Sequence, residues 1–371
     1  INGRLAGGLG ISLVELEDAL QAAVGYGMVS ISGQGAASVV RLTDLVRIAA
    51  LWELEESGKM SDWEEASFAS LRRAISSFSL ESPSDWALTA MFANAVNAAI
   101  MRVASGDRDP SVQGDLLESA TRVAVAKYLM GEYVEGREIA NSALRVLDGA
   151  VSTSARFRGR LVAANCLRER GDVPAALREY SALRGALTGV SPADEIELEL
   201  ADLRARREVG AARYVEAPLR RLSTRSRSEL GETHKLTCWV TLNLGRCLRD
   251  QGRHEEASVC YEEVERWWGR ENVPDDLTSL DIQFEIAENL RESGSAARSL
   301  EIFRQIIPLL ESVYGSSHAN ALITKLGCAM ALRECDELLL SREMAADISE
   351  AIRFTFGENS RYAKSAAALS A

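Results

Sequence analysis

One short pattern recurs along the chain at a nearly constant interval. The segment LRDQG ends at Gly252, and NLRESG ends 42 residues later at Gly294. A further 42 residues on, ALRECD ends at Asp336. A fixed period of roughly 20 to 50 residues is typical of repeat architectures, in which each unit buries its apolar face only against its neighbours. The pattern therefore favours a linear stack of similar units over one globular core.

Small residues recur in register with these turns. With Gly252 as the reference, one small residue stands five positions after each turn and another stands seven positions before it. Two antiparallel helices approach to roughly 8 Å only where side chains are short, so the sequence predicts six helix pairs. The residues after the turns are Gly136, Ala176, Ala217, Ala257, Ser299 and Ser341, and those before them are Ala124, Ala164, Ala205, Gly245, Ala287 and Ala329.

Glycine occupies most of the predicted turns, where it suits a left-handed C-cap that ends the first helix of a pair. In the third unit this register places Ala212 at the turn, and Arg204 and Glu208 at positions that are usually apolar. The third unit therefore looks degenerate. The predicted turn residues are Gly131, Gly171, Ala212, Gly252, Gly294 and Asp336.

These features resemble the tetratricopeptide repeat. The resemblance rests on small residues at positions 8 and 20 of each unit, glycine near position 15, and Tyr180, Tyr261 or Phe303 near position 24. The period near 42 and the connectors LGETHKLT, YGSSHANA and FGENSRYA are similar to the long repeats of kinesin light chains. The resemblance implies an all-α superhelix, with six units and a partial seventh, that binds proteins or peptides.

The first residues follow a different pattern. The segments SLVELEDALQAAV and TDLVRIAALWELEE predict helices, and GMVSISGQGAASVVRL between them predicts a β-hairpin. Helix, hairpin and helix in this order resemble the end of a winged-helix domain. We therefore expect a winged-helix-like remnant at 1–60, a helical connector at 61–112 and the repeat array at 113–371.

This order of parts resembles the C-terminal portion of STAND-class signalling ATPases, and in particular actinobacterial NB-ARC proteins with tetratricopeptide repeats. The resemblance implies that the chain is the ligand-sensing regulatory arm of such an ATPase. The chain begins with Ile1, so we interpret it as a fragment of a longer protein. No GxxxxGK[ST] motif occurs in it, so we assign it neither a nucleotide nor any other cofactor.

Candidate binding residues lie at positions 9 and 12 of the first helix in each unit, which share one face of that helix. Position 12 is arginine in four of six units, with Tyr128 in the first and Val209 in the third; position 9 of the third is Arg206. Because arginine binds carboxylates in bidentate fashion, this ladder favours an acidic ligand or a free C-terminal carboxylate. The candidates are Asn165, Arg168, Arg246, Arg249, Glu288, Arg291 and Arg333.

A structural role for these arginines is the alternative. Each of the four precedes an acidic residue, so the charges could solvate the turn or bridge to the next helix instead of binding a ligand. The acids are Glu169, Asp250, Glu292 and Glu334. The paired Trp267 and Trp268 present a similar choice between core packing and a binding anchor, and we expect core packing. His234 and His318 stand in equivalent connectors, where we expect packing or capping roles.

Composition excludes several other classes of function. The net charge of −12 and the absence of Lys and Arg from SISGQGAAS argue against nucleic-acid binding. The alternative to the sensing arm of an ATPase is therefore a freestanding adaptor that joins two proteins. A DNA-binding regulator is the third and least favoured interpretation. No apolar run is long enough to span a bilayer. Six cysteines without a CxxC pair indicate reduced thiols in a cytoplasmic protein. No nucleophile–base pair or metal-ligand spacing indicates an enzyme. The final half unit of the repeat array predicts either a missing cap or an edge for self-association.

Overall fold

The computed structural model describes residues 29–32, 39–42, 52–53, 56–58, 60–80, 82–104, 110–147, 153–185, 189–271 and 277–370. Strand β1 (Val29–Ser32) pairs antiparallel with β2 (Val39–Leu42), with Val29 opposite Leu42. This confirms the predicted hairpin. The helix predicted before it lies outside the described residues, as does most of the helix predicted after it.

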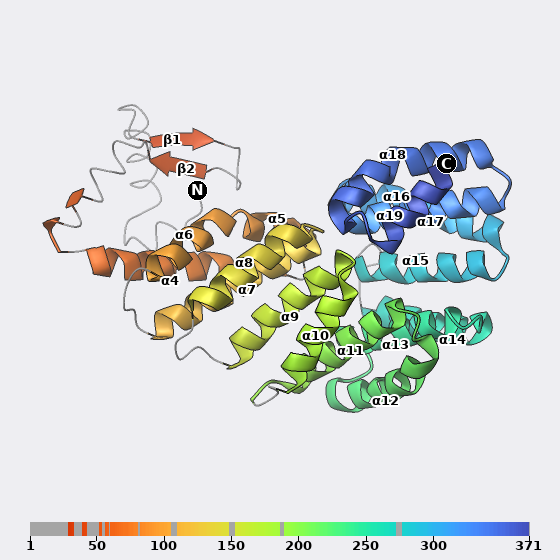
Figure 1. Cartoon of the computed structure of the whole chain (residues 1–371), viewed down its shortest axis with the longest axis horizontal. Coiled ribbons are helices and arrows are strands. Elements are labelled where there is room, and N and C mark those ends of the chain that lie inside the picture. Colours follow the sequence, from red (N-terminus) through yellow and green to blue (C-terminus); the bar gives the residue numbers. More distant parts are fainter. Residues whose placement is uncertain are drawn as a thin grey trace.

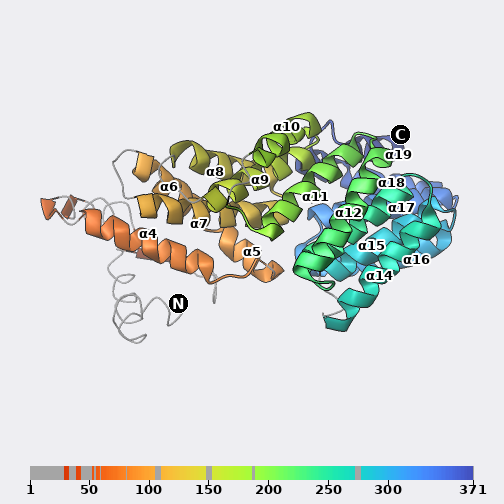
Figure 2. The same cartoon turned by 90° about the horizontal axis from the view of Figure 1, so that it is seen from below.

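Three helices follow the hairpin and lie against the start of the repeat array. They are α4 (Met60–Ser76), α5 (Pro83–Ala90) and α6 (Ala93–Ala104). Helices α4 and α5 pack on the first repeat helix and α6 packs on the first two, as Figures 1 and 2 show. The indole of Trp86 anchors α5 by donating a hydrogen bond of 2.8 Å to the Leu80 carbonyl.

The described part of 110–370 consists of antiparallel helix pairs stacked in chain order (Figure 1). We call the first helix of each pair helix A and the second helix B. This is the all-α helical-repeat fold that the period predicted. Units 1 to 6 are α7 (Pro110–Leu129) with α8 (Tyr133–Val146), α9 (Thr153–Glu169) with α10 (Val173–Arg184), α11 (Pro192–Glu208) with α12 (Ala212–Leu230), α13 (Lys235–Arg249) with α14 (His254–Glu271), α15 (Leu277–Glu292) with α16 (Ala296–Tyr314), and α17 (Ala319–Glu334) with α18 (Leu338–Phe356); α19 (Arg361–Ser370) is helix A of a seventh.

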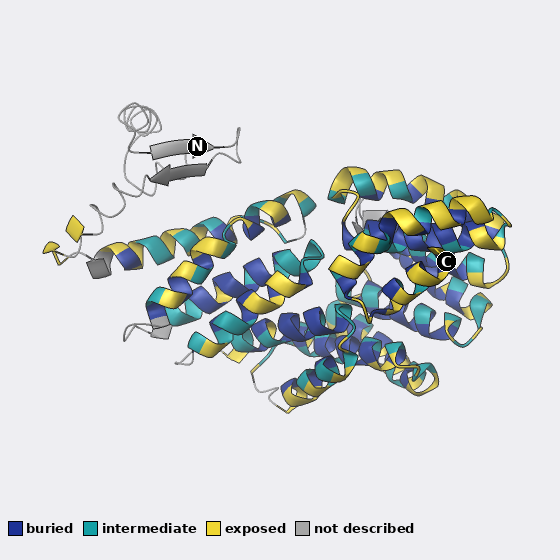
Figure 3. Ribbon diagram, turned by 45° about the horizontal axis from the view of Figure 1, so that its top comes forward, coloured by how far each residue is buried: buried dark blue, intermediate teal, exposed yellow. Residues whose placement is uncertain are grey.

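Short side chains allow the two helices of a pair to approach, as predicted. Ala257 and Ala287 are both fully buried. At Gly245 of α13, an added Cβ would lie only 2.5 Å from Cε1 of Tyr261 on α14. The aromatic ring thus occupies the space that a larger residue on helix A would need. Figure 3 shows buried residues along these helix contacts and exposed residues on the outward sides.

The third unit corrects the predicted register. Its turn lies at Gly210, with φ of +85°, two residues before Ala212, which is already helical. Consequently Val215 rather than Ala217 is the buried residue five positions after the turn, and Ala217 is exposed. The small residues Ala205 and Ala217 suited the expected register by coincidence. The other predicted turns are left-handed as expected, and Asp336 has φ of +63°.

Capping side chains fix where the helices begin. His234 and His318 are the N-caps of α13 and α17, and each Nδ1 accepts a hydrogen bond of 3.2 Å from the backbone N–H two residues on. This confirms the capping role predicted for both histidines. Trp267 is buried beneath the Arg227 guanidinium, 4.6 Å from the ring centroid, as core packing predicts.

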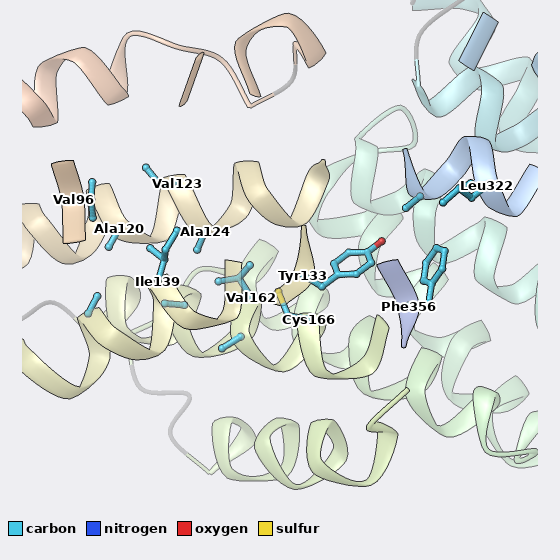
Figure 4. Packing of buried hydrophobic residues seen from close by; sticks show 14 of the residues in the cluster. Val96, Ala120, Val123, Ala124, Tyr133, Ile139, Val162, Cys166, Leu322 and Phe356 are labelled. Carbon is cyan, nitrogen blue, oxygen red and sulfur yellow. The ribbon is translucent and has the colours of Figure 1, made fainter. Parts of the chain in front are cut away.

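The two ends of the array meet. One continuous hydrophobic cluster contains residues of α4 and α6–α9 together with residues of α17–α19. Figure 4 shows the ring of Tyr133 on α8 facing Phe356 on α18, with Leu322 of α17 nearby; the two ring centroids are 5.9 Å apart. The superhelix therefore closes on itself.

Candidate functional site

A four-residue motif ends helix A in most of the units. It reads arginine, acid, any residue and glycine, with aspartate replacing the glycine in unit 6. In each copy the amide of the last residue donates to the carbonyl of the arginine, at 2.8 Å for Gly252 and 3.2 Å for Asp336. The arginines therefore occupy equivalent positions. The copies are RERG at 168–171, REVG at 207–210, RDQG at 249–252, RESG at 291–294 and RECD at 333–336.

The ladder thus contains five consecutive arginines, one more than the sequence predicted. Arg207 occupies the position assigned to Val209, which is exposed at the turn. The REVG motif at 207–210 was the signal that could have located it. The acid in this motif, Glu208, is equivalent to Glu169 and Asp250, so the third unit is regular at this position.

Each arginine of the ladder except the last reaches the motif acid of the following unit. Tyr128 begins the series with a hydrogen bond of 3.2 Å from its hydroxyl to Glu169. The contacts that follow are Arg168–Glu208 at 2.7 Å, Arg207–Asp250 at 2.7 Å, Arg249–Glu292 at 3.6 Å and Arg291–Glu334 at 2.6 Å. The ladder therefore links neighbouring units, as the structural alternative expected.

Burial makes this pairing obligatory for the inner members of the ladder. Side-chain exposure is 2% for Arg168, 5% for Arg207 and 10% for Arg249. A guanidinium removed from water is costly unless a carboxylate compensates it. These three arginines are therefore held in place by acids of the chain before any ligand arrives.

A second cluster lies where α13 meets α15. Glu285 accepts hydrogen bonds from Arg246 at 2.6 Å and Arg249 at 2.8 Å. Burial alone would raise the pKa of Glu285, but the two guanidinium groups lower it to about 2. Arg246 also lies over the Trp239 ring. Sequence reasoning identified both arginines and missed the carboxylate that joins them.

Asp281 lies one helical turn before Glu285 on α15 and behaves differently. Burial raises the pKa of Asp281 to about 7, Arg246 opposes the increase and Glu285 adds to it. The Asn320 amide donates to the Asp281 carboxyl at 3.1 Å. Asp281, Glu285 and Glu288 are spaced by four and three residues, so their common helix face could have been read from the segment DIQFEIAE.

The remaining predicted residues make contacts of other kinds. Asn165 accepts a hydrogen bond of 2.8 Å from the Tyr180 hydroxyl. Glu288 binds Arg291 of its own helix at 3.0 Å. Arg333 is exposed, and within the described residues it forms no ion pair. It is thus the ladder arginine most available to a ligand carboxylate.

In the described structure, the Nε atoms of several cluster arginines are buried without a hydrogen-bond partner, and so are two polar atoms of other residue types on α13 and α14. These two atoms are Oδ1 of Asn243 on α13 and the hydroxyl of Tyr261 on α14. The Asn243 amide nitrogen is satisfied, because it donates to the Trp239 carbonyl at 2.8 Å. A buried acceptor left unpaired costs about 1–3 kcal/mol, which an N–H group of a ligand would recover.

A groove of about 840 Å³ lies on the side of the B helices, between α10 and α12 with α11 as its floor. Arg206 lines this groove and donates a hydrogen bond of 2.8 Å to Asp202. Arg206 therefore does not occupy the inner position 9 that the sequence assigned to it. Arg204 does, and its guanidinium lies 3.7 Å from Glu169.

Comparisons with known proteins identify the fold. No protein-family model matches the sequence, and no curated protein matches it. A Rap protein complexed with competence and sporulation factor is 12% identical with a TM-score of 0.54, covering 88% of this chain and 90% of that chain. The Rap conjugation gene regulator of plasmid pLS20, complexed with the Phr* peptide, is 12% identical with a TM-score of 0.50, covering 70% and 75%. BtubC from P. vanneervenii is 14% identical with a TM-score of 0.46, covering 62% and 92%.

At these identities the likeness shows the fold alone, which is a helical-repeat solenoid similar to tetratricopeptide-repeat proteins. Among the described helices, none has the length and apolar character needed to cross a membrane. Within the same residues, no three His, Cys, Asp or Glu side chains gather as potential metal ligands.

Proposed function

We propose that the chain binds a peptide, or an extended segment of a partner protein, along the inner face of its superhelix without catalysing a reaction there. The observation that carries this proposal is the buried, unpaired Oδ1 of Asn243, which stands three residues before Arg246 on α13. Because Asn243 is only 1% exposed, its side chain has to turn outward before a backbone N–H of an extended ligand can satisfy this oxygen. The likeness to two Rap structures whose names include a bound factor or peptide is consistent with this class of ligand.

The chemistry proposed for the ligand is an acidic side chain or a free C-terminal carboxylate. Arg168, Arg207 and Arg249 already bind carboxylates of the chain, so a ligand would have to displace those acids. Arg333 is exposed and could take a carboxylate directly. We therefore place the anionic end of the ligand near Arg333 and its backbone near Asn243.

A random peptide library with free C-terminal carboxylates tests this assignment when screened beside a C-terminally amidated copy. The wild-type chain is expected to enrich peptides from the free-acid library. Arg333→Ala should weaken binding of the selected peptides at least tenfold, and Asn243→Ala should do so for both libraries. Arg220→Ala, on the B-helix side, is the matched control and should bind normally. No enrichment, or equal loss in the control, would contradict the assignment.

At a finer level, the chain is proposed to be the sensing arm of a STAND-type ATPase in the cytoplasm. The order of the β1–β2 hairpin, α4–α6 and the repeat array supports this proposal, as do six free cysteines of which five are buried. We retain the divisions 1–60, 61–112 and 113–371 as part of it. A selected peptide should change nucleotide exchange in the natural full-length polypeptide. Unchanged exchange would favour the adaptor instead.

A further inference from the structure

The contact between the ends of the array is built from turns and connectors, and we call it the clasp. The turns of units 1 and 2, at Gly131 and Gly171, lie against the connectors that precede α17 and α19. An added Cβ on Gly131 would lie 3.1 Å from the Ala319 Cβ, and one on Gly171 would lie 3.4 Å from the Ser360 Cα. The same kind of contact therefore occurs twice, one unit apart.

Polar groups cross the clasp at both turns. Arg170 Nη1 donates to the carbonyls of Phe354 and Thr355, at 2.5 and 3.2 Å. His318 Nε2 lies 2.8 Å from the Leu129 carbonyl oxygen. Helix-end carbonyls that have no partner within their own helix are thus satisfied from the opposite end of the array.

The two hydrogen bonds of His318 define its protonation state. A carbonyl oxygen only accepts, so Nε2 carries the proton in the contact with Leu129. Nδ1 accepts the Asn320 N–H, so it carries none. The imidazole in the closed clasp is therefore neutral, and a second proton on Nδ1 would remove the N-cap of α17.

The surroundings of His318 oppose protonation of its imidazole. The groups facing the ring are Trp86 of α5 and Tyr314 of α16, with ring centroids at 6.3 and 4.8 Å, together with the Leu129 carbonyl of α7. Among the described residues, no charged side chain contributes to its pKa, which burial lowers although the bond to Leu129 opposes this effect. Opening the clasp would return the pKa towards about 6.5. The open form would then bind more protons, so closure is favoured above about pH 6.5 and weakens as the pH falls.

Closure also brings α19 close to the ladder of units 2 and 3. Burial opposes ionisation of Glu208, but Arg168 and then Arg361 of α19 lower its pKa, with smaller effects from Arg204 and Arg207. Arg361 therefore lies near enough to Glu208 to affect its charge. When the clasp is shut, α19 restricts approach to this part of the inner face.

We propose that the clasp is a gate: neutral His318, together with Arg170, holds the superhelix shut, and protonation of His318 opens it and uncovers the inner face of units 2 and 3. This gate concerns the shape of the free protein. It therefore stands or fails independently of the proposed peptide function, and its test needs no ligand.

Small-angle X-ray scattering of the full chain at pH 8.0 and pH 5.5 tests the gate, with circular dichroism to verify that helix content is retained. The radius of gyration of the wild type should rise on acidification without loss of helix. His318→Gln keeps an uncharged N–H donor directed at Leu129, so its radius should be insensitive to pH. His318→Asn with Arg170→Ala removes both polar links while Asn retains a capping oxygen, so this variant should be expanded already at pH 8.0.

The matched control is His234→Asn, because His234 caps α13 in the same way and has no hydrogen bond across the clasp within the described part of the chain. It should follow the wild type at both pH values. A wild-type radius that is the same at the two pH values would overturn the gate, as would equal expansion of the wild type and His318→Gln. If the double variant loses helix, the comparison between wild type and His318→Gln still decides the question.

Discussion

The Arg207 guanidinium donates a hydrogen bond of 2.7 Å to the carboxylate of Asp250, which belongs to the next repeat unit. The arginine is almost fully buried and the aspartate is partly exposed. The contact is one step of a series in which unit after unit binds its successor through the same two motif positions. Electrostatics thus reinforces the stacking that the apolar faces begin.

Replacing Arg207 should weaken the array where units 3 and 4 meet. Arg207→Ala removes a buried partner from Asp250, and the expected loss of stability is about 2–3 kcal/mol, because the exposed side of Asp250 can regain water. The urea midpoint, followed by circular dichroism, measures this loss. Arg220→Ala, which breaks an exposed pair with Glu216, should change stability by less than about 0.5 kcal/mol. Equal effects of the two substitutions would contradict a structural role for the ladder.

The close approach at Gly245 predicts an overpacking penalty. Gly245→Ala directs a methyl group into the Tyr261 ring and should cost about 1–3 kcal/mol. Gly114→Ala is the matched control, because this helical glycine has open space around it and alanine should be neutral or stabilising. Adding Tyr261→Leu to Gly245→Ala should recover part of the loss. Additive losses in the double variant would show that the two positions do not touch.

Asp281 should make the protein less stable as the pH rises. Its pKa is about 7 in the folded chain against an ordinary value of 3.8, so the folded state holds the proton more tightly. The penalty therefore grows from about pH 4 to pH 7 and is constant above that. Asp281→Asn retains an acceptor for Asn320 and should raise the melting temperature more at pH 8 than at pH 5. A gain that is the same at both pH values would contradict the shifted pKa.

Glu285, on the same helix, gives stability the opposite dependence on pH. Its pKa is about 2, so its contribution to stability is present above about pH 4.5 and is lost as the pH falls towards 2. Glu285→Gln should therefore lower the melting temperature to a similar extent at pH 5 and pH 8. A loss confined to one of these pH values would show that a group other than the Glu285 carboxylate is titrating.

The left-handed turn of unit 6 predicts a stabilising substitution. Asp336 has φ of +63°, in the region where residues with a Cβ are strained, and units 2 to 5 have glycine at this position. Asp336→Gly should raise stability by about 0.5–1 kcal/mol in thermal unfolding. The reverse change at an equivalent turn, Gly294→Asp, should lower it by a similar amount. Stabilisation by both substitutions would refute the backbone explanation.

The repeat and its helix pairs could be predicted from sequence because small residues and glycine turns reflect local packing. The third unit was misplaced because a search for small residues accepts Ala205 and Ala217 as readily as residues that are small for a reason. The motif ending at Gly210 combines a backbone requirement with a charge requirement, so it is more specific. The shared helix face of Asp281 and Glu285 is visible in the sequence, but their different protonation depends on neighbours contributed by other helices.

The clasp could not be predicted from sequence. Nothing in the sequence around Leu129 or His318 indicates that the two residues meet. The distance between them depends on curvature that accumulates over every unit between them. Their 189-residue separation contrasts with the ladder contacts, which always join adjacent units. Local rules therefore establish the stack, whereas the sum of small rotations determines whether its ends coincide.

Closure has a consequence for how such a chain can change during evolution. An open solenoid tolerates duplication or loss of a repeat, because each unit needs only its two neighbours. Here, one unit more or fewer would carry Tyr133 and Phe356 past each other, although each remaining unit could still make a ladder contact with its new neighbour. The number of units is therefore fixed by the need for the two ends to meet. Lineages that keep the closed superhelix must diverge by substitution within repeats.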